Sequence, residues 1–198
     1  ALTHGGIENN VKVKIEWINA EKIETDQLIN ELKNVDGILI PGGFGYRGVE
    51  GKIQAIKFAR ENDIPFFGIC LGMQLSVIEI SRNLIGKQDS NSTEFKTSNN
   101  PIVSLMTEWN NENKIEKRDL TSDKGGTMRL GAYRAILKKG SKIHNIYNSD
   151  EISERHRHRY EVDLSYTKDF EQKGFHFSGM SPDNILPEVI ESVNHKWF

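Results

Sequence analysis

A buried strand that turns directly into a helix is the feature that most constrains how this chain can fold. The apolar run Ile64–Ile69 is typical of a strand buried on both faces, and the spacing of Leu75 and Ile78 predicts a helix over residues 71–82. The turn Gly68-Ile69-Cys70-Leu71-Gly72 joins the end of this strand directly to the start of this helix. Glycines on both sides of such a turn let the strand and helix backbones approach closely. This arrangement belongs to layered α/β folds.

A second strand and its helix precede this unit. The run Gly37–Pro41 is apolar at successive positions, and residues 51–62 place Ile53, Ile56 and Ala59 on one helical face. A further helix is expected over residues 25–33. Strands and helices that alternate in this way predict an α/β fold with three αβα layers and a mostly parallel central sheet.

The second half of the chain has a different pattern. Short strand-like segments punctuated by Asn, Asp, Ser and Gly predict an antiparallel C-terminal extension, with strands over residues 101–105, 133–137, 175–179 and 188–192. If residues 155–159 form a strand, Arg155, Arg157 and Arg159 share one face and His156 and His158 share the other. The alternative to a ligand-binding role is that this run of charged residues forms a solvent-exposed face.

The ends of the sequence suggest a single domain, residues 1–198, that is incomplete at both termini. Residues 1–6 resemble the last turn of a helix followed by glycine caps, without the strand that usually opens an α/β fold. Residues 196–198 resemble the start of a strand.

Charge and cysteine content narrow the function classes. The 26 basic and 28 acidic side chains give a net charge of -2, which favours neither nucleic acid nor a membrane surface as a partner. No apolar run approaches the ~18 residues that span a bilayer. The single cysteine excludes a disulfide within the chain and indicates a reducing compartment, so we expect a cytoplasmic protein.

Cys70 is the candidate nucleophile. A sharp strand-to-helix turn pushes the side chain out of the fold, and the helix N-terminus is expected to lower the pKa of the thiol. The amide of Leu71 would then point toward the oxyanion of a tetrahedral intermediate. The alternative is that Cys70 is a small core residue.

The glycine-rich loop Pro41–Gly48 follows the other predicted strand. Its Gly43, Gly45 and Gly48 match a dinucleotide fingerprint, but they precede the helix instead of opening it. A phosphate-binding P-loop also fails, because Gly51-Lys52 is followed by Ile53. Neighbouring parallel strands end side by side, so we expect the loop to lie beside Cys70 and to offer a second oxyanion donor. A plain glycine-rich turn is the alternative.

Several segments together resemble the class I glutamine amidotransferases and, within them, the glutaminase domains of the CTP synthase family. The likeness runs over residues 1–198. It is carried by Pro41-Gly42-Gly43-Phe44-Gly45, Gly68-Ile69-Cys70-Leu71-Gly72-Met73-Gln74, Arg47-Gly48-Val49-Glu50-Gly51-Lys52, Asn91-Ser92-Thr93-Glu94-Phe95, Gly125-Gly126-Thr127-Met128-Arg129-Leu130-Gly131 and Glu154-Arg155-His156-Arg157-His158-Arg159-Tyr160-Glu161. The implied fold is flavodoxin-like.

The resemblance implies that Cys70 attacks the side-chain amide of glutamine and forms a glutamyl thioester. Gly43 and Leu71 would form the oxyanion hole, and GTP would activate the reaction near Gly51 and Arg118. Residues implied to bind L-glutamine are Gly43, Phe44, Leu71, Gly72, Met73, Gln74, Glu94 and Arg159. The zwitterionic ligand fits this set, since an acid can hold its ammonium and an arginine its carboxylate.

The resemblance also implies partners outside these residues. Ammonia would pass to a synthetase domain of the same polypeptide, which uses ATP and Mg²⁺ to aminate UTP, within a homotetramer. No metal or cofactor is expected in the glutaminase domain itself.

The family completes its site with a histidine and a glutamate in a Phe-His-Pro-Glu segment that the 198 residues do not contain. Expelling ammonia requires a general acid and hydrolysing the thioester requires a base, so we expect the chain alone to be inactive. None of the six histidines occupies the family's position for this base, and His195 matches a non-catalytic one. Two alternatives stay open: a regulatory or assembly module of the same fold, and a cysteine hydrolase of another class.

Overall fold

The computed structural model describes residues 1–21, 27–105, 108–111, 114–117 and 128–196. Its helical elements are α1 (Leu2–Glu8), α2 (Gln27–Leu32), α3 (Val49–Glu61), α4 (Leu71–Ile80), the π-helical turn η2 (Ser81–Ile85), α5 (Lys142–Tyr147), the 3-10 turn η3 (Leu164–Tyr166) and α6 (Thr167–Gln172). Its strands are β1 (Ile38–Ile40), β2 (Phe66–Gly68), β3 (Val103–Leu105), β4 (Glu108–Asn111), β5 (Lys114–Lys117), β6 (Arg129–Leu137), β7 (Glu151–His158), β8 (Tyr160–Val162), β9 (Phe175–Met180) and β10 (Pro187–Ser192). None of the described helices is long and apolar enough to cross a lipid bilayer.

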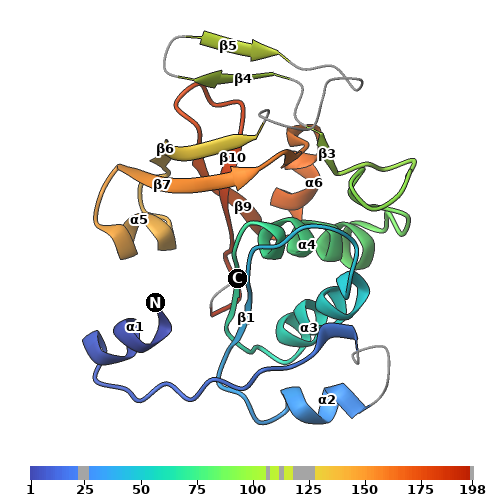
Figure 1. Ribbon diagram of the computed structural model, residues 1–198, viewed down its shortest axis with the longest axis vertical. Coiled ribbons are helices and arrows are strands. Elements are labelled where there is room, and N and C mark those ends of the chain that lie inside the picture. Colours follow the sequence, from blue (N-terminus) through green and yellow to red (C-terminus); the bar gives the residue numbers. More distant parts are fainter. Residues whose placement is uncertain (22–26, 106–107, 112–113, 118–127, 197–198) are drawn as a thin grey trace.

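The strand–helix unit predicted around Cys70 is present. β1 and β2 pair in parallel, with Ile38 opposite Phe66 and Ile40 opposite Gly68. Figure 1 shows α3 and α4 stacked together beside β1. The predicted faces of both helices are buried in one apolar core, in which Ile56, Leu75 and Ile78 are fully inaccessible to solvent. Burial of these faces is what holds the unit together.

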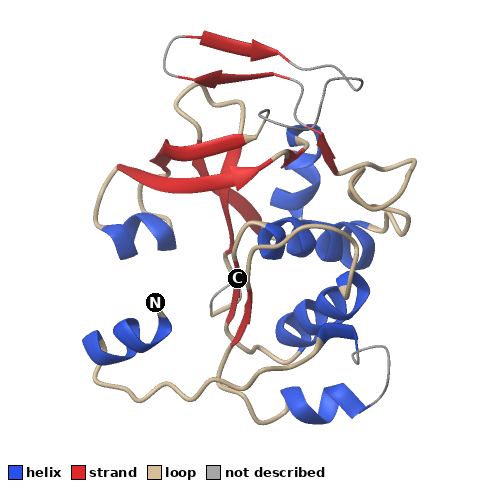
Figure 2. Cartoon of the chain, in the orientation of Figure 1, coloured by secondary structure: helices blue, strands red, loops and turns tan. Residues whose placement is uncertain are grey.

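The antiparallel part of the fold is larger than the sequence predicted. Strands β10, β9, β6 and β7 form a four-stranded sheet in that order, and the β6–β7 ladder runs from Arg129 opposite His158 to Ile136 opposite Glu151. Figure 2 shows this sheet above the β1–β2 pair. Among the described residues, parallel pairing is limited to β1 with β2 and one isolated bridge between Ser92 and Val103. The α/β class is confirmed, but within the described residues the parallel sheet consists of the β1–β2 pair, and the larger sheet is antiparallel.

Three predicted boundaries were wrong. α1 continues through Gly5 and Gly6 to Glu8, so these glycines do not cap it. α4 is prolonged by the π-helical turn to Ile85. Arg159 lies in a bend between β7 and β8, so only Arg155 and Arg157 share a strand face. The helix expected over residues 25–33 is described from Gln27 to Leu32, and residues 197–198 of the expected C-terminal strand lie outside the described residues.

Candidate active site

The backbone at Cys70 has the strained geometry expected of a nucleophile turn. Its φ of 54° and ψ of -103° are unusual for a residue with a side chain, and α4 begins at the next residue. A Cβ on Gly72 would lie 2.3 Å from the carbonyl oxygen of Ile40, and one on Gly68 would lie 2.6 Å from the carbonyl carbon of Gly72. Both glycines are therefore required for the close approach of strand and helix, as predicted.

The glycine-rich loop lies against the cysteine, which confirms the expected neighbourhood. A Cβ on Gly42 would be 3.4 Å from the Cβ of Cys70 and 3.9 Å from its sulfur. The backbone amides of Leu71 and Gly43 both hydrogen-bond to the thiol. Two amides that converge on one atom have the geometry of an oxyanion hole. Their role in catalysis stays a prediction.

The predicted direction of the Cys70 pKa was wrong. Burial raises the pKa of the Cys70 thiol above its ordinary value, although the amides of Leu71 and Gly43 act in the opposite direction. The negative charges of Glu161 and Glu94 raise it further. A helix N-terminus favours a thiolate, but here desolvation and two carboxylates outweigh it.

A cavity of about 350 Å³ opens beside Cys70. One wall comes from β2 and the start of α4, and the opposite wall comes from β7, β8 and β10. The second wall carries charged side chains, whereas Phe66 and Phe67 make the first wall apolar. Among the predicted glutamine-binding residues, Met73 and Gln74 line this cavity with Cys70.

The remaining predicted ligand residues take different positions. Glu94 accepts a hydrogen bond of 2.8 Å from the amide of Gly45, which joins it to the glycine-rich loop and so to Cys70. Gln74 is buried, and its Nε2 donates to the carbonyl oxygen of Tyr160 at 2.7 Å. Its side chain therefore ties α4 to β8. Phe44 is half exposed, with the guanidinium of Arg157 5.9 Å from its ring centre.

The last of these predicted residues, Arg159, lies in the bend after β7. Its Nε atom is buried and has no hydrogen-bond partner within the described residues. A buried donor of this kind is costly unless a ligand accepts from it. The structure thus leaves a guanidinium nitrogen available for an acceptor, as the predicted role requires.

Only one of the two residues expected to respond to GTP lies within the described residues. Gly51 is buried in the first turn of α3. Arg118 lies outside the described residues. His195, which was expected to be non-catalytic, is buried with its Nε2 3.2 Å from the carbonyl oxygen of Ala59 on α3.

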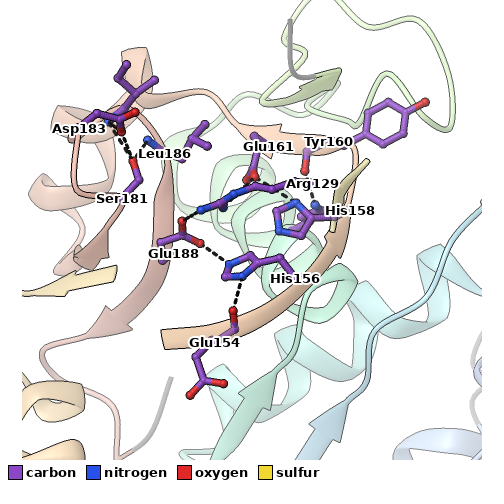
Figure 3. A network of polar contacts seen from close by, with 12 residues as sticks. Arg129, Glu154, His156, His158, Tyr160, Glu161, Ser181, Asp183, Leu186 and Glu188 are labelled. Atoms are coloured by element: carbon purple, nitrogen blue, oxygen red, sulfur yellow. Dashed lines mark hydrogen bonds and ion pairs between the residues drawn. The ribbon is translucent and has the colours of Figure 1, made fainter. Parts of the chain in front are cut away.

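Sequence reasoning missed a group of charged side chains in and directly behind the cavity wall. Arg129 and Glu161 occur in the amidotransferase-like motifs but were given no role, and Glu188 was not singled out. Together with His156 and His158 they form a buried polar network (Figure 3). The signal that could have found it is the face shared by the two histidines, since two imidazoles on one buried face need acidic partners. No group of three or more His, Cys, Asp or Glu within the described ranges could hold a metal ion.

The whole chain, residues 1–198, matches the glutamine amidotransferase class-I family. It is 55% identical over 198 residues to a CTP synthase of Paramagnetospirillum magneticum and 57% identical over 199 residues to one of Nitrobacter hamburgensis. All of the chain is aligned in both cases, yet it spans only 37% of the length of these relatives.

The comparison with solved structures agrees with these sequence matches. The fold is similar to the glutaminase domain of Trypanosoma brucei CTPS with bound acivicin, with a TM-score of 0.86 and 37% identity over 98% of this chain and 74% of that one. A putative GMP synthase subunit from Thermoplasma acidophilum shares the fold at a TM-score of 0.55 and 13% identity, over 97% of this chain and 71% of that one.

Proposed function

The chain belongs to the class I glutamine amidotransferases, and from this premise we propose that it is the glutaminase domain of a CTP synthase. In this proposal it hydrolyses L-glutamine at Cys70 and supplies ammonia for the ATP-dependent amination of UTP. The observation that carries it is the Cys70 elbow, where two backbone amides converge on a thiol at the mouth of a cavity. The CTP synthase relatives support the identity of the acceptor reaction.

The first chemical step follows from this geometry. The thiol of Cys70 gives up its proton, and its sulfur bonds to the side-chain carbonyl carbon of glutamine. The negative charge that develops on the carbonyl oxygen would be held by the amides of Gly43 and Leu71, which already face the sulfur. The C–N bond then breaks, the proton given up by the thiol ends on the leaving nitrogen so that it departs as ammonia, and a glutamyl thioester remains.

We propose that Glu94 and Arg159 hold the amino-acid end of glutamine. Glu94 is anchored to the loop beside Cys70, where its carboxylate can accept from the ligand ammonium. The buried Nε of Arg159 has no hydrogen-bond partner within the described residues, and a guanidinium binds a carboxylate through parallel hydrogen bonds. These two roles, and those of Phe44, Gly72, Met73 and Gln74 in the pocket, are part of the proposal.

Further parts of the proposal lie beyond the described geometry. The acceptor chemistry would belong to a synthetase domain that binds ATP, Mg²⁺ and UTP, with GTP as activator and a homotetramer as the assembly. The expected cytoplasmic location stays a prediction.

The test is Cys70→Ala in the full-length protein. Glutamine-dependent synthesis should fall at least about 1,000-fold, because the variant has no nucleophile, whereas synthesis from added ammonia should be unchanged. Release of glutamate and CTP formation, measured side by side, separate the two activities. Retained glutamine-dependent synthesis in the variant would refute the proposal. If the wild-type protein releases no glutamate from glutamine, the chain is a regulatory module or a hydrolase of another class.

A further inference from the structure

Arg129 is the centre of the charged network (Figure 3), and it contacts two residues of the cavity lining, Glu161 and Glu188, without lining the cavity itself. Its side chain is only 2% exposed, donates to the carboxylate of Glu188 on β10, and brings Nη1 to 3.6 Å from Oε1 of Glu161 on β8. It therefore joins the four-stranded sheet, which contains β6 and β10, to the separate β3–β8 pair. The guanidinium also lies 4.3 Å from the ring centre of Tyr133. This bridge places a buried cation beside Glu161.

His156 links Glu188 to the backbone of β7. Its Nδ1 lies 2.9 Å from the carbonyl oxygen of Glu154, and its Nε2 lies 2.6 Å from Oε2 of Glu188. Burial opposes ionisation of Glu188, but hydrogen bonds from His156 and Arg129 lower the pKa of its carboxyl. Glu188 is therefore a carboxylate that His156 and Arg129 share.

Glu161 has a different set of neighbours. Its Oε1 lies 3.0 Å from Nδ1 of His158, and both side chains are nearly buried. Both residues also line the cavity that contains Cys70. Since Glu188 already occupies the shorter contact of Arg129, the guanidinium neutralises Glu161 only in part. A partly neutralised carboxylate therefore faces the same cavity as the thiol.

We infer that Glu161, paired with Arg129 and His158, is a positioning residue that adds to the effect of burial in disfavouring the thiolate of Cys70 in the resting protein, and that the imidazole of His158 opposes this effect. This deepens the proposed function and rests on it only for Cys70 as the nucleophile. A carboxylate in a low-dielectric cavity disfavours a second negative charge, and a nearby cation favours it. Binding of a cationic ligand group in the cavity would then release the thiol.

Several other charged groups near Cys70 or in the cavity lining are included in this balance. Glu94 lies in the loop after η2 and acts in the same sense as Glu161. Glu154, Arg155, His156, Arg157 and Glu188 line the cavity from β7 and β10. Burial opposes the imidazolium of His158, yet the adjacent Glu161 raises the pKa of this histidine and so favours its positive charge.

The experiment measures alkylation of Cys70 by iodoacetamide in the full-length protein, followed by peptide mass spectrometry from about pH 6 to about pH 9.5. Since only the thiolate reacts, Glu161→Gln should raise the rate at pH 7 by about threefold or more and move the profile to lower pH. His158→Gln should lower the rate and move the profile to higher pH. Glu151→Gln is the matched control. It removes a carboxylate from the far end of β7, the strand that carries His158, and should leave the profile unchanged.

Glu161→Gln and His158→Gln are expected to change the alkylation rate in opposite directions, so the experiment distinguishes an effect of charge from structural damage. Loosened packing would expose Cys70 and accelerate both variants, and that result, or unchanged profiles, would overturn the inference. If Glu161→Gln does not fold, the His158→Gln profile decides: slower alkylation supports the inference, and equal or faster alkylation overturns it. Because no glutamine is present, the result is independent of whether the protein is a glutaminase.

Discussion

The two walls of the cysteine cavity are built by different physical means. The elbow wall, formed by β2 and α4 and backed by β1, depends on the close approach of backbones: Gly68 and Gly72 permit contacts that no side chain could make. The opposite wall depends on buried ion pairs between Arg129, Glu188 and His156, which come from three strands. The first wall is encoded within a few neighbouring residues, whereas the second exists only after distant strands have paired. The nucleophile is therefore placed by local sequence and its charge environment by tertiary structure.

The largest effect is expected where the elbow wall is changed. Gly72→Ala would put a methyl group 2.3 Å from the carbonyl oxygen of Ile40, a backbone atom of a buried strand. We expect a loss of at least about 4 kcal/mol in the free energy of unfolding, measured by urea denaturation. Gly5→Ala is the control, since a Cβ there meets nothing within 4 Å in a helix and should be neutral or slightly stabilising. A Gly72→Ala variant as stable as the wild type would show that α4 can shift away from β1, and that the elbow wall does not depend on this close backbone contact.

A smaller loss in the free energy of unfolding is expected when the opposite wall, the charged wall of β7, β8 and β10, is changed. Glu188→Gln removes the carboxylate shared by Arg129 and His156 and leaves the buried guanidinium of Arg129 without its closest ionic partner. Breaking a buried pair in this way should cost about 3 kcal/mol at pH 7. The same denaturation experiment measures it, and Glu151→Gln on the exposed side of β7 serves as the control.

The pH dependence of this loss tests its electrostatic origin. The folded protein lowers the pKa of Glu188, so its contribution is fully present above the ordinary pKa range of glutamate and is lost as the pH falls through the lowered folded value. The stability difference between wild type and Glu188→Gln should therefore be largest at neutral pH and shrink in acid. A difference that stayed constant with pH would assign the effect to packing.

The smallest effect is expected at the rim of the charged wall. Tyr147 donates a 2.6 Å hydrogen bond to Glu154, which raises the pKa of Tyr147 to about 12. Because Tyr147 is 45% exposed, Tyr147→Phe should cost less than about 1 kcal/mol. In the folded protein at about pH 11, the variant should show the same tyrosinate absorbance at 295 nm as the wild type, since Tyr147 is still protonated there. A lower absorbance in the variant would contradict this assignment.

Most of the elbow wall could be predicted from the sequence. The two apolar strands, their helices and the glycine turn depend on hydrophobic patterns and backbone sterics, which act over neighbouring residues. The loop at Gly42 and Gly43 lies beside Cys70 because parallel strands end at the same edge. The end of α4 was missed, since the π-helical turn has no signal in a simple helical period.

The charged wall could not be predicted in the same way. Arg129 and Glu188 are 59 positions apart, and nothing local to either residue indicates the other. The direction of the Cys70 pKa was wrong for a related reason: the helix N-terminus is visible in the sequence, but burial and the approach of Glu161 are not. Fold class and nucleophile follow from short-range patterns, and electrostatics requires the assembled structure.

The left-handed backbone at Cys70 also limits how this protein can evolve. At a φ of 54° a side chain branched at Cβ meets its own backbone, whereas cysteine and serine carry a single heavy atom there. Cys70→Ser is therefore compatible with this backbone and would exchange sulfur for oxygen. Cys70→Thr is not, because its branched side chain does not fit the conformation, whatever the reactivity of its hydroxyl. The turn selects among nucleophiles by their branching as much as by their reactivity.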